Sequence, residues 1–493
     1  MRIKLFLLIV LIFNSLTAQH LSLKDSYLEI KNENLIKVVR YLSSKELEGR
    51  LSGSDGYNKA ASFMANEFAY LDFKPMGDKK YFQYFNVEYN EILAPAKLNL
   101  IENNQVKKEF NLGKDYVFRG FTGSGHITAP LAFVGYGITN TKLNYDEYAG
   151  IDVKGKIVIA FKYSPKWRLE DKYHLGDLSL REKISNAYTH GAVAILFVSF
   201  PNDAKPQEPI LSVLDGEGKQ NETFPSMHID IPVADEFLAG SGYTLKDLQT
   251  RIDSTRRPFS IPLTTTAEIL ATAKYYEEME TMNVVGMLEG SDPILKNEYL
   301  VVGAHLDHVG SQAGEIYAPG ANDNASGSAA VLEMARTFAK SKIKPKRSII
   351  FVLFACEEIG LYGAKHFVDN SPVPLEKIAA MINLDCVGYG DSIQVGNGKS
   401  APALWRIARS NDSLYTKMIT NNTWLGGGAD ATPFHQKGIP CAYFVTTNSY
   451  AYLHSITDTA ETLNKDLFEK VVRLAYLTAS EVANGNYQKE KIK

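Results

Sequence analysis

The stretch Val301–Ser328, which reads VVGAHLDHVGSQAGEIYAPGANDNASGS, decides how the second half of the chain is organised. It opens with an apolar run that ends in a His-x-Asp pair at His305 and Asp307, and a Gly-rich polar loop then leads to Asp323. Imidazole and carboxylate are ligands that borderline metals prefer. A buried strand that delivers them into a loop therefore indicates a metal site, although a lone His-x-Asp pair also fits a strand end that faces water.

Further apolar runs in this half also end in acids or histidine. The run RSIIFVLFAC leads to Glu357 and Glu358, KIAAMINL leads to Asp385, and His454 follows CAYFVTT and its loop. In open α/β sheets, ligands bind at the carboxyl ends of the strands. Each residue by itself could belong to a solvated loop, but their arrival at one edge predicts a shared site.

The spacing also suggests different roles for these residues. Glu357 and Glu358 are neighbours whose side chains diverge, so one can bind metal while the other faces the reacting water. A hydrolase of this kind needs both a Lewis acid and a base. Paired metals lie about 3.5–4 Å apart and share a carboxylate, and Asp323 is placed to bridge them. Asp307 suits the orientation of the His305 ring.

Helical and strand-like stretches alternate through this half. Helices are expected at 325–340, 361–369, 430–437 and 466–483, with continuous apolar strands between them. An N-terminal pair of helices is expected near 34–44 and 60–71. This pattern is typical of an α/β fold with a mostly parallel sheet flanked by helices on both faces.

The stretch 91–272 has a different character and is expected to form an inserted, β-rich domain. Short β-like runs alternate with Gly, Asn, Asp and Pro turns, with one helix near 181–192. Its histidines lack ligand spacing: His126, His174, His190 and His228. The insert is expected to shape access or contact large substrates, so removing 94–272 is expected to leave metal binding intact.

Composition excludes several classes of function. The 493 residues carry a formal net charge of −3, so no basic field suggests a nucleic-acid partner. Residues 1–18 fit a signal peptide, because MRIK precedes an apolar run too short to span a bilayer. No later stretch predicts a membrane span, so we expect an exported protein, periplasmic or extracellular. The three cysteines do not make a disulfide framework, and nothing indicates the oligomeric state.

Five motifs in order resemble the two-zinc exopeptidases of the bacterial leucyl aminopeptidase and glutamate carboxypeptidase II type: HLDH, PGANDNASG, ACEEIGLYGA, NLDCVG and LHSITDT. The insert resembles a protease-associated domain. The resemblance implies the zinc-peptidase (phosphorylase/hydrolase-like) α/β fold. It divides the chain into a signal peptide (1–18), an N-terminal part of the peptidase domain (20–90), the insert (91–272) and the catalytic domain (273–486).

The resemblance also implies a ligand set for two Zn²⁺ ions. His305 and Asp385 would hold one ion, Glu358 and His454 the other, and Asp323 would lie between them. Glu357 would be the general base, and Asp307 would orient His305. Asp430 is followed by Ala431 where many relatives have His, and the Gly-rich WLGGGAD leaves the oxyanion donor open, with Tyr450 and Tyr452 as candidates.

The function implied is an exported aminopeptidase that removes N-terminal residues of peptides through a water activated by the metals, with Glu357 as base. A carboxypeptidase of the same fold is the first alternative, but the loop 388–398 offers no arginine for a substrate carboxylate. A glutaminyl cyclase is a further alternative. A non-catalytic receptor or binding protein on this fold is the alternative from another class, and it would be marked by lost ligands.

Overall fold

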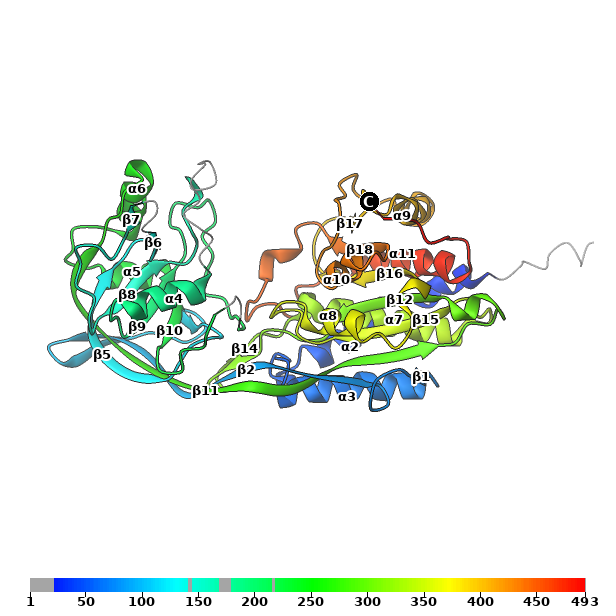
Figure 1. Ribbon diagram of the computed structural model, residues 1–493, viewed down its shortest axis with the longest axis horizontal. Coiled ribbons are helices and arrows are strands. Elements are labelled where there is room, and N and C mark those ends of the chain that lie inside the picture. Colours follow the sequence, from blue (N-terminus) through cyan, green and yellow to red (C-terminus); the bar gives the residue numbers. More distant parts are fainter. Residues whose placement is uncertain (1–21, 141–143, 168–178, 215–217, 493) are drawn as a thin grey trace, which may run out of the picture.

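The computed structural model describes residues 22–140, 144–167, 179–214 and 218–492, and these residues form two lobes (Figure 1). One lobe combines the N-terminal helices with the C-terminal half of the chain, and the other holds the insert. Two long strands, β2 (Phe82–Glu102) and β11 (Ile261–Leu288), pair antiparallel and run through both lobes. The expected boundaries at residues 91 and 273 therefore fall inside continuous strands rather than in linkers.

The catalytic lobe, as we call the first of these, is built on four parallel strands. Their order across the sheet is β18 (Cys441–Thr446), β16 (Ile378–Leu384), β12 (Tyr299–His305) and β15 (Ser348–Phe354). Antiparallel strands flank them: β17 (Ile393–Gly396) on β18, and β11 with β1 (Lys74–Pro75) beyond β15. The chain passes from β12 to β15 on one side and returns to β16 on the other, which makes the carboxyl end of β12 a switch point of the kind where open α/β sheets bind ligands.

Helices cover both faces of this sheet, as the sequence predicts. The larger layer holds five helices: α2 (Asn32–Leu42), α3 (Asp55–Tyr70), α7 (Gly327–Lys340), α9 (Pro402–Tyr415) and α11 (Lys465–Ala483). The other layer holds α8 (Tyr362–Asp369) and α10 (Ala431–Gln436). The mostly parallel α/β fold is confirmed. The helix expected from 325 begins at Gly327, because Ala321–Ser326 form a separate wide turn.

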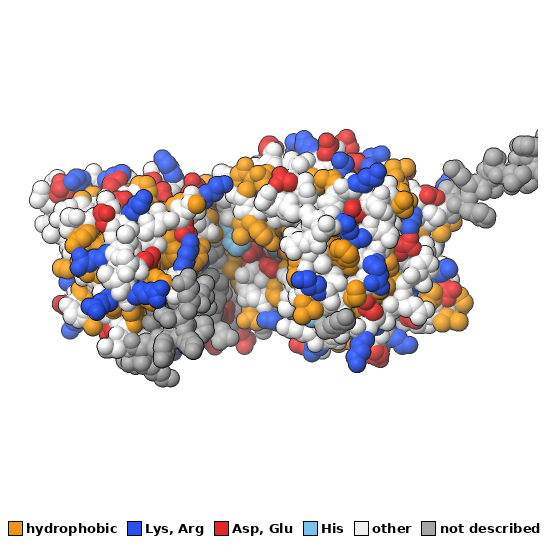
Figure 2. All heavy atoms as spheres, turned by 90° about the horizontal axis from the view of Figure 1, so that it is seen from above, with side chains coloured by type: hydrophobic (Ala, Val, Ile, Leu, Met, Phe, Trp, Pro, Cys, Tyr) orange, Lys and Arg blue, Asp and Glu red, His pale blue; other side chains and the backbone are white. Residues whose placement is uncertain are grey.

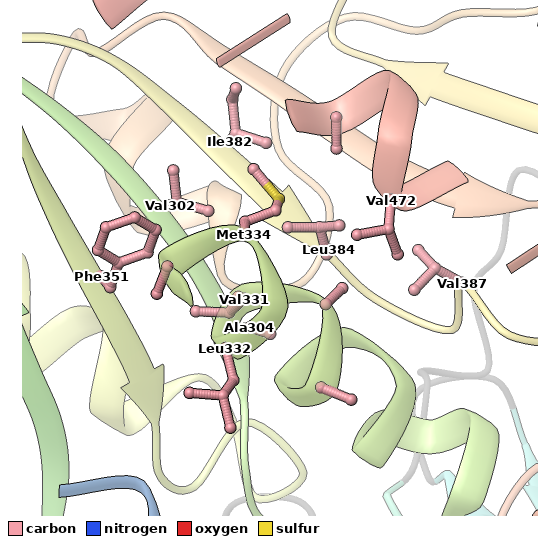
Figure 3. Close-up of a cluster of buried hydrophobic side chains, with 14 of the residues drawn as sticks. Val302, Ala304, Val331, Leu332, Met334, Phe351, Ile382, Leu384, Val387 and Val472 are labelled. Carbon is pink, nitrogen blue, oxygen red and sulfur yellow. The ribbon is translucent and has the colours of Figure 1, made fainter. Parts of the chain in front are cut away.

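Strand alternation separates the two buried layers of the sheet. Val302 and Ala304 of β12 pack under α7 together with Phe351 of β15 and Ile382 of β16 (Figure 3). Intervening residues such as Val301 face the layer that contains α8 and α10. Because side chains alternate along a strand, continuous apolar runs supply both layers at once. This two-sided core holds the carboxyl ends of the strands in fixed positions.

The inserted lobe has a smaller sheet with its own core. Parallel strands β5 (Gly125–Phe133), β8 (Ile157–Phe161), β9 (Ala194–Val198) and β10 (Ser226–Ile229) lie between antiparallel β11 and β4 (Tyr116–Phe118). The remaining elements are β3 (Gln105–Glu109), β6 (Thr139–Asn140), β7 (Tyr145–Asp146), α4 (Leu180–Thr189), α5 (Ile231–Phe237) and α6 (Leu245–Thr255). The lobe is β-rich as expected, with three helices where the sequence indicates one.

The two lobes also touch away from the shared strands, at a contact we call the joint. The side chain of Gln312, in β13 (Ser311–Gln312, paired with β14, Ile316–Tyr317), accepts from the Phe118 N–H at 2.9 Å and donates to the Phe118 carbonyl at 2.7 Å. Apolar side chains of both lobes pack beside it, namely Val117, Leu211, Val213, Val309 and Ala318. The joint fixes the insert against the carboxyl edge of the catalytic sheet.

Short 3-10 turns complete the described chain at Leu23–Glu29, Lys45–Leu47, Leu295–Asn297, Leu375–Lys377 and Ser449–Tyr452. Within the described residues, no helix combines the length and apolarity needed to cross a membrane.

Candidate metal centre

The sheet edge brings together all five side chains expected to bind metal. His305 ends β12, Asp385 follows β16, and Glu358 follows β15 after a short turn. Asp323 lies in the turn before α7, and His454 follows the 3-10 turn after β18. Residues far apart in sequence thus meet because parallel strands end at one edge.

The first group of ligand atoms surrounds His305. Its Nε2 lies 3.3 Å from Asp323 Oδ1 and 3.5 Å from Asp385 Oδ1, and all three side chains are buried. Two ligand atoms on a tetrahedral zinc with bonds of about 2.0–2.2 Å lie about 3.3–3.5 Å apart. The spacing therefore suits one zinc between these three side chains.

The second group uses the other oxygen of Asp323. His454 Nε2 lies 3.4 Å from Asp323 Oδ2 and 2.9 Å from Glu358 Oε2. Asp323 therefore directs one oxygen to each histidine. A carboxylate in this position can bridge two metals.

His308 joins this second group, and its place was not predicted from the sequence. Its Nδ1 lies 2.7 Å from Glu358 Oε1 and 3.9 Å from Asp323 Oδ2. The shorter separation is that of a hydrogen bond, so His308 donates to the Glu358 oxygen that faces away from His454. In the sequence, His308 is marked only as the second histidine of HLDH. It reaches Glu358 because the loop after β12 folds back.

Asp307 holds the main chain of the two glutamates and also lies beside the His305 ring. Its carboxylate accepts the N–H groups of Glu357 at 3.2 Å and Glu358 at 3.4 Å. The His305 Nδ1 lies nearer to the Asp307 carbonyl, at 3.2 Å, than to its carboxylate, at 3.6 Å. Asp307 therefore fixes the main chain that carries the two glutamates, and both its carboxylate and its carbonyl lie beside the His305 ring.

Two further side chains hold the loops of the centre. The fully buried Arg50 donates to main-chain carbonyls of Leu42, Leu306, Pro319 and Gly320. Asp458 accepts the N–H groups of Asn322 and Asp323 at 3.0–3.1 Å. These contacts fix the turn that presents Asp323.

The charges of the centre match a bound cation. Burial opposes the charged form of His454, yet Glu358 and Asp323 outweigh it and raise its pKa to about 10. Burial likewise opposes charging of His305, but the surrounding carboxylates raise its pKa well above the usual value. Buried carboxylates this close require compensating positive charge. Asp385 Oδ1 also has no hydrogen-bond partner among the described residues, so the donor set fits zinc.

Glu357 lies beside these ligands but belongs to neither group. Burial, reinforced by Asp385, Glu358 and Asp430, raises its pKa well above the usual carboxyl value, and His305 opposes this shift. A carboxyl group next to a reacting water is suited to proton transfer. Glu357 is therefore a carboxyl group beside the two groups of ligands that is not itself a member of either.

Other candidate residues lie outside the two groups. Cys356 and Cys386 are buried and absent from both, while His435 packs against Gly426. In the insert, His228 is fully buried and lies 3.0 Å from Ser199 Oγ, and His174 falls outside the described residues. Asp430 was not predicted as a residue of the site. It is fully buried, and the charges of His305 and Asp385 act on it.

Tyr450, one of the two tyrosine candidates, interacts with residues of the metal centre. The charges of Asp385 and Asp323 act on it, and burial raises its pKa. It also interacts with Tyr443, whose hydroxyl donates to Asp385 Oδ2 at 3.1 Å. Tyr452 packs against Tyr389, with ring centroids 5.2 Å apart.

A cleft between the lobes leads to this centre. Its volume is about 450 Å³, and it is lined by Glu358 and His454 on one side and by the segment Ile210–Val213 of the insert on the other. Figure 2 shows the hollow between the lobes, with histidine and acidic side chains at its floor. Arg119 and Lys162 of the insert lie on its far wall. A ligand in the cleft would contact both lobes.

Both lobes match known protein families. Residues 283–479 match peptidase family M28, and residues 127–236 match the PA domain. The chain is 26% identical over 404 residues to "Aminopeptidase YwaD" of Bacillus subtilis, an alignment covering 77% of this chain and 74% of that one. It is 39% identical over 161 residues to "Leupeptin-inactivating enzyme 1" of Streptomyces exfoliatus, 32% of this chain and 34% of that one.

Solved structures share the fold over nearly the whole length. A zinc aminopeptidase from Bacillus subtilis has a TM-score of 0.64 at 22% identity, covering 94% of this chain and 98% of that one. An aminopeptidase from Aneurinibacillus sp. strain AM-1 has a TM-score of 0.64 at 20% identity, covering 95% and 96%. The sequence matches and the shared fold agree: this chain combines a peptidase domain of family M28 with an inserted PA domain.

Proposed function

We propose that the protein is a two-zinc aminopeptidase. One observation carries the proposal: Asp323 directs separate oxygens to His305 and His454, so two groups of zinc-type ligands share one carboxylate. His305 and Asp385 would hold one ion, and Glu358 and His454 the other. Zinc at such a site supplies Lewis-acid polarisation of a carbonyl and lowers the pKa of water.

The side chains around the ligands supply the proton chemistry. Glu357 takes a proton from the attacking water and passes it to the leaving amine. The neighbouring carboxylates and burial raise the pKa of Glu357, which favours its holding the proton between the two transfers. Asp307 holds the Glu357 main chain through the 3.2 Å hydrogen bond, which keeps the carboxyl group directed at the centre. Asp307 is thus a positioning residue for the proposed base Glu357.

Tyr450 is our candidate for the donor to the developing oxyanion. Tyr450 is partly exposed, and the charges of Asp385 and Asp323 act on it. It also interacts with Tyr443, whose hydroxyl donates to Asp385. A raised pKa keeps its hydroxyl protonated and able to donate. Donors of this kind stabilise charge that appears only in the transition state.

The cleft favours cleavage at a chain end. A space of about 450 Å³ between two lobes suits the end of a peptide rather than the middle of a folded protein. Two relatives that align over most of the chain are named aminopeptidases, which supports release of the N-terminal residue. The free α-amine would lie near the carboxylates of the metal centre.

We also propose that the protein is exported. Residues 1–18 have the charge and apolar pattern of a signal peptide, and they lie outside the described residues. A fusion of residues 1–30 to a reporter tests this in a bacterial host, since export requires both secretion and cleavage near Ala18. Retention of the uncleaved fusion in the cytoplasm would refute the proposal.

A peptide panel tests the activity directly. The zinc-loaded protein is incubated with peptides that have a free amine, a blocked amine or a blocked carboxyl group. We expect release of the first residue from peptides with a free amine, no cleavage after amine blocking, and loss of activity with a chelator. Release of the C-terminal residue, or cleavage unaffected by the chelator, would contradict the proposal.

A further inference from the structure

His454 is the least enclosed of the metal-binding side chains. It is 22% exposed, whereas Glu358 is 5% and Asp323 is 8% exposed. Its main chain adopts a left-handed conformation with a φ of 55°. A residue other than glycine keeps such a conformation only where its surroundings hold it. A contact that holds this main chain would therefore help to keep the His454 side chain in place.

The inserted lobe provides a contact of this kind. The N–H of Leu211 donates to the His454 carbonyl at 3.1 Å. Leu211 belongs to the insert and is only 1% exposed. The hydrogen bond therefore joins the main chain of one lobe to the main chain of a metal-binding residue in the other.

Both lobes fix the segment that carries this donor. Ser212 Oγ accepts the Gly120 N–H at 3.0 Å, and Gly120 has no room for a Cβ because Val213 main-chain atoms would lie 2.3 Å away. Leu211 and Val213 also pack with Val309 of the catalytic lobe in the joint. The segment is thus held on both sides and cannot easily move away from His454.

We propose that the insert completes the zinc site of Glu358 and His454, because the Leu211 N–H positions the His454 main chain. The site at His305 and Asp385 has no such contact with the insert among the described residues. Occupancy of one site therefore depends on the docked insert, while occupancy of the other does not. This inference rests on the two-zinc proposal, and it replaces the expectation that removal of 94–272 leaves metal binding intact.

The same segment also faces the cleft. Ile210–Val213 line the cleft opposite Glu358 and His454. Displacement of this segment would both widen the cleft and break the hydrogen bond to the His454 carbonyl. Leu211 is accordingly a positioning residue that links substrate access to metal retention.

A pair of proline variants tests the role of the N–H group. Leu211→Pro removes the donor to His454, whereas Ile210→Pro is a matched control, since no hydrogen bond from the Ile210 N–H occurs among the described residues. Both full-length variants are loaded with zinc, and the affinity of each site is measured by competition with a chelator. Circular dichroism and thermal melting verify that they fold.

We expect the wild type and Ile210→Pro to retain two zincs. In Leu211→Pro, the affinity of one site should fall by about 10–100-fold, the usual effect of losing support behind a metal ligand, while the other site stays unchanged. Two zincs of wild-type affinity in a folded Leu211→Pro protein would overturn the inference. A wild type that binds no zinc would instead refute the two-zinc proposal.

Hydrogen exchange on the unmodified protein gives an independent measurement should Leu211→Pro fail to fold. With zinc bound, the Leu211 amide should exchange far more slowly than an exposed amide, and chelation should accelerate it. Exchange of this amide at the rate of a free amide in the zinc-loaded protein would overturn the inference.

Discussion

Glu357 and Glu358 are adjacent in sequence but have opposite electrostatic surroundings. Burial raises the pKa of both, but His454 and the hydrogen bond from His308 lower that of Glu358 to about 2. For Glu357, burial and nearby carboxylates raise the pKa against the opposing charge of His305. In our proposal, environment rather than residue type therefore separates the ligand Glu358 from the base Glu357.

Replacement of the base tests this division. Glu357→Gln keeps the shape of the side chain but cannot accept a proton, so turnover should fall by about 2–4 orders of magnitude, the usual effect of losing general acid–base catalysis. Zinc content and thermal midpoint should remain those of the wild type. Near-normal turnover with zinc bound would show that another group is the base.

Two downstream histidines provide a matched pair for the ligand assignment. His454→Ala removes the nitrogen 2.9 Å from Glu358, so one zinc should be lost and activity with it. His435 lies outside both groups, and His435→Ala should keep both ions. Elemental analysis of the purified variants decides between them. Two zincs in the His454 variant, or one in the His435 variant, would refute the assignment.

The contact between His308 and Glu358, which the sequence did not predict, can also be tested. His308→Ala leaves Glu358 Oε1 without its 2.7 Å donor, so the carboxylate can rotate away from His454. Zinc affinity should fall by about 10–100-fold, as measured by competition with a chelator. The half-buried His366 on α8 serves as control, since it stacks on Phe85. Equal affinities in the two variants would exclude the role.

At the scale of elements, a buried glutamate lies at the turn between β5 and β8. Glu147 accepts the Ile138 N–H at 3.1 Å and the Tyr145 hydroxyl at 3.0 Å. Burial raises its pKa to about 7 despite these hydrogen bonds. Between pH 4.5 and 7 the folded insert therefore binds more protons than the unfolded chain, so its free energy of unfolding falls as pH rises.

Glu147→Gln should remove this dependence. Between pH 4.5 and 8, the free energy of unfolding of the wild type should fall by about 3 kcal/mol more than that of the variant, from the shift of the pKa. Urea unfolding of the inserted lobe at both pH values measures the difference. Glu222→Gln, at an exposed position, should behave like the wild type. Parallel pH profiles for wild type and Glu147→Gln would refute the titration.

At the scale of the molecule, metal and stability are coupled through the crowded carboxylates. Removal of zinc should lower the thermal midpoint of the catalytic lobe by several degrees, because a ligand at 1,000 times its Kd contributes about 4 kcal/mol to the folded state. Calorimetry with a chelator measures the shift, zinc restores it, and magnesium serves as the control. An unchanged midpoint after verified zinc removal would contradict the coupling.

The sequence by itself determined the α/β layers and most of the metal centre. Continuous apolar runs predict buried parallel strands, and the polar residues that end them, such as His305 and Asp385, meet at one edge because parallel strands share their direction. The five motifs also carried the family resemblance. These features are local, since periodicity and strand ends can be read without knowledge of what packs against them.

Only the tertiary structure decided the contacts made by loops. His308 reaches Glu358 because Arg50 and the neighbouring turn fold the loop back, and the insert reaches His454 through the Leu211 main chain. Asp307 likewise binds the N–H groups of Glu357 and Glu358 in addition to lying beside the His305 ring. A main-chain hydrogen bond depends little on residue type, so sequence patterns cannot reveal it. The bond from Leu211 to His454 exists only because the two lobes dock.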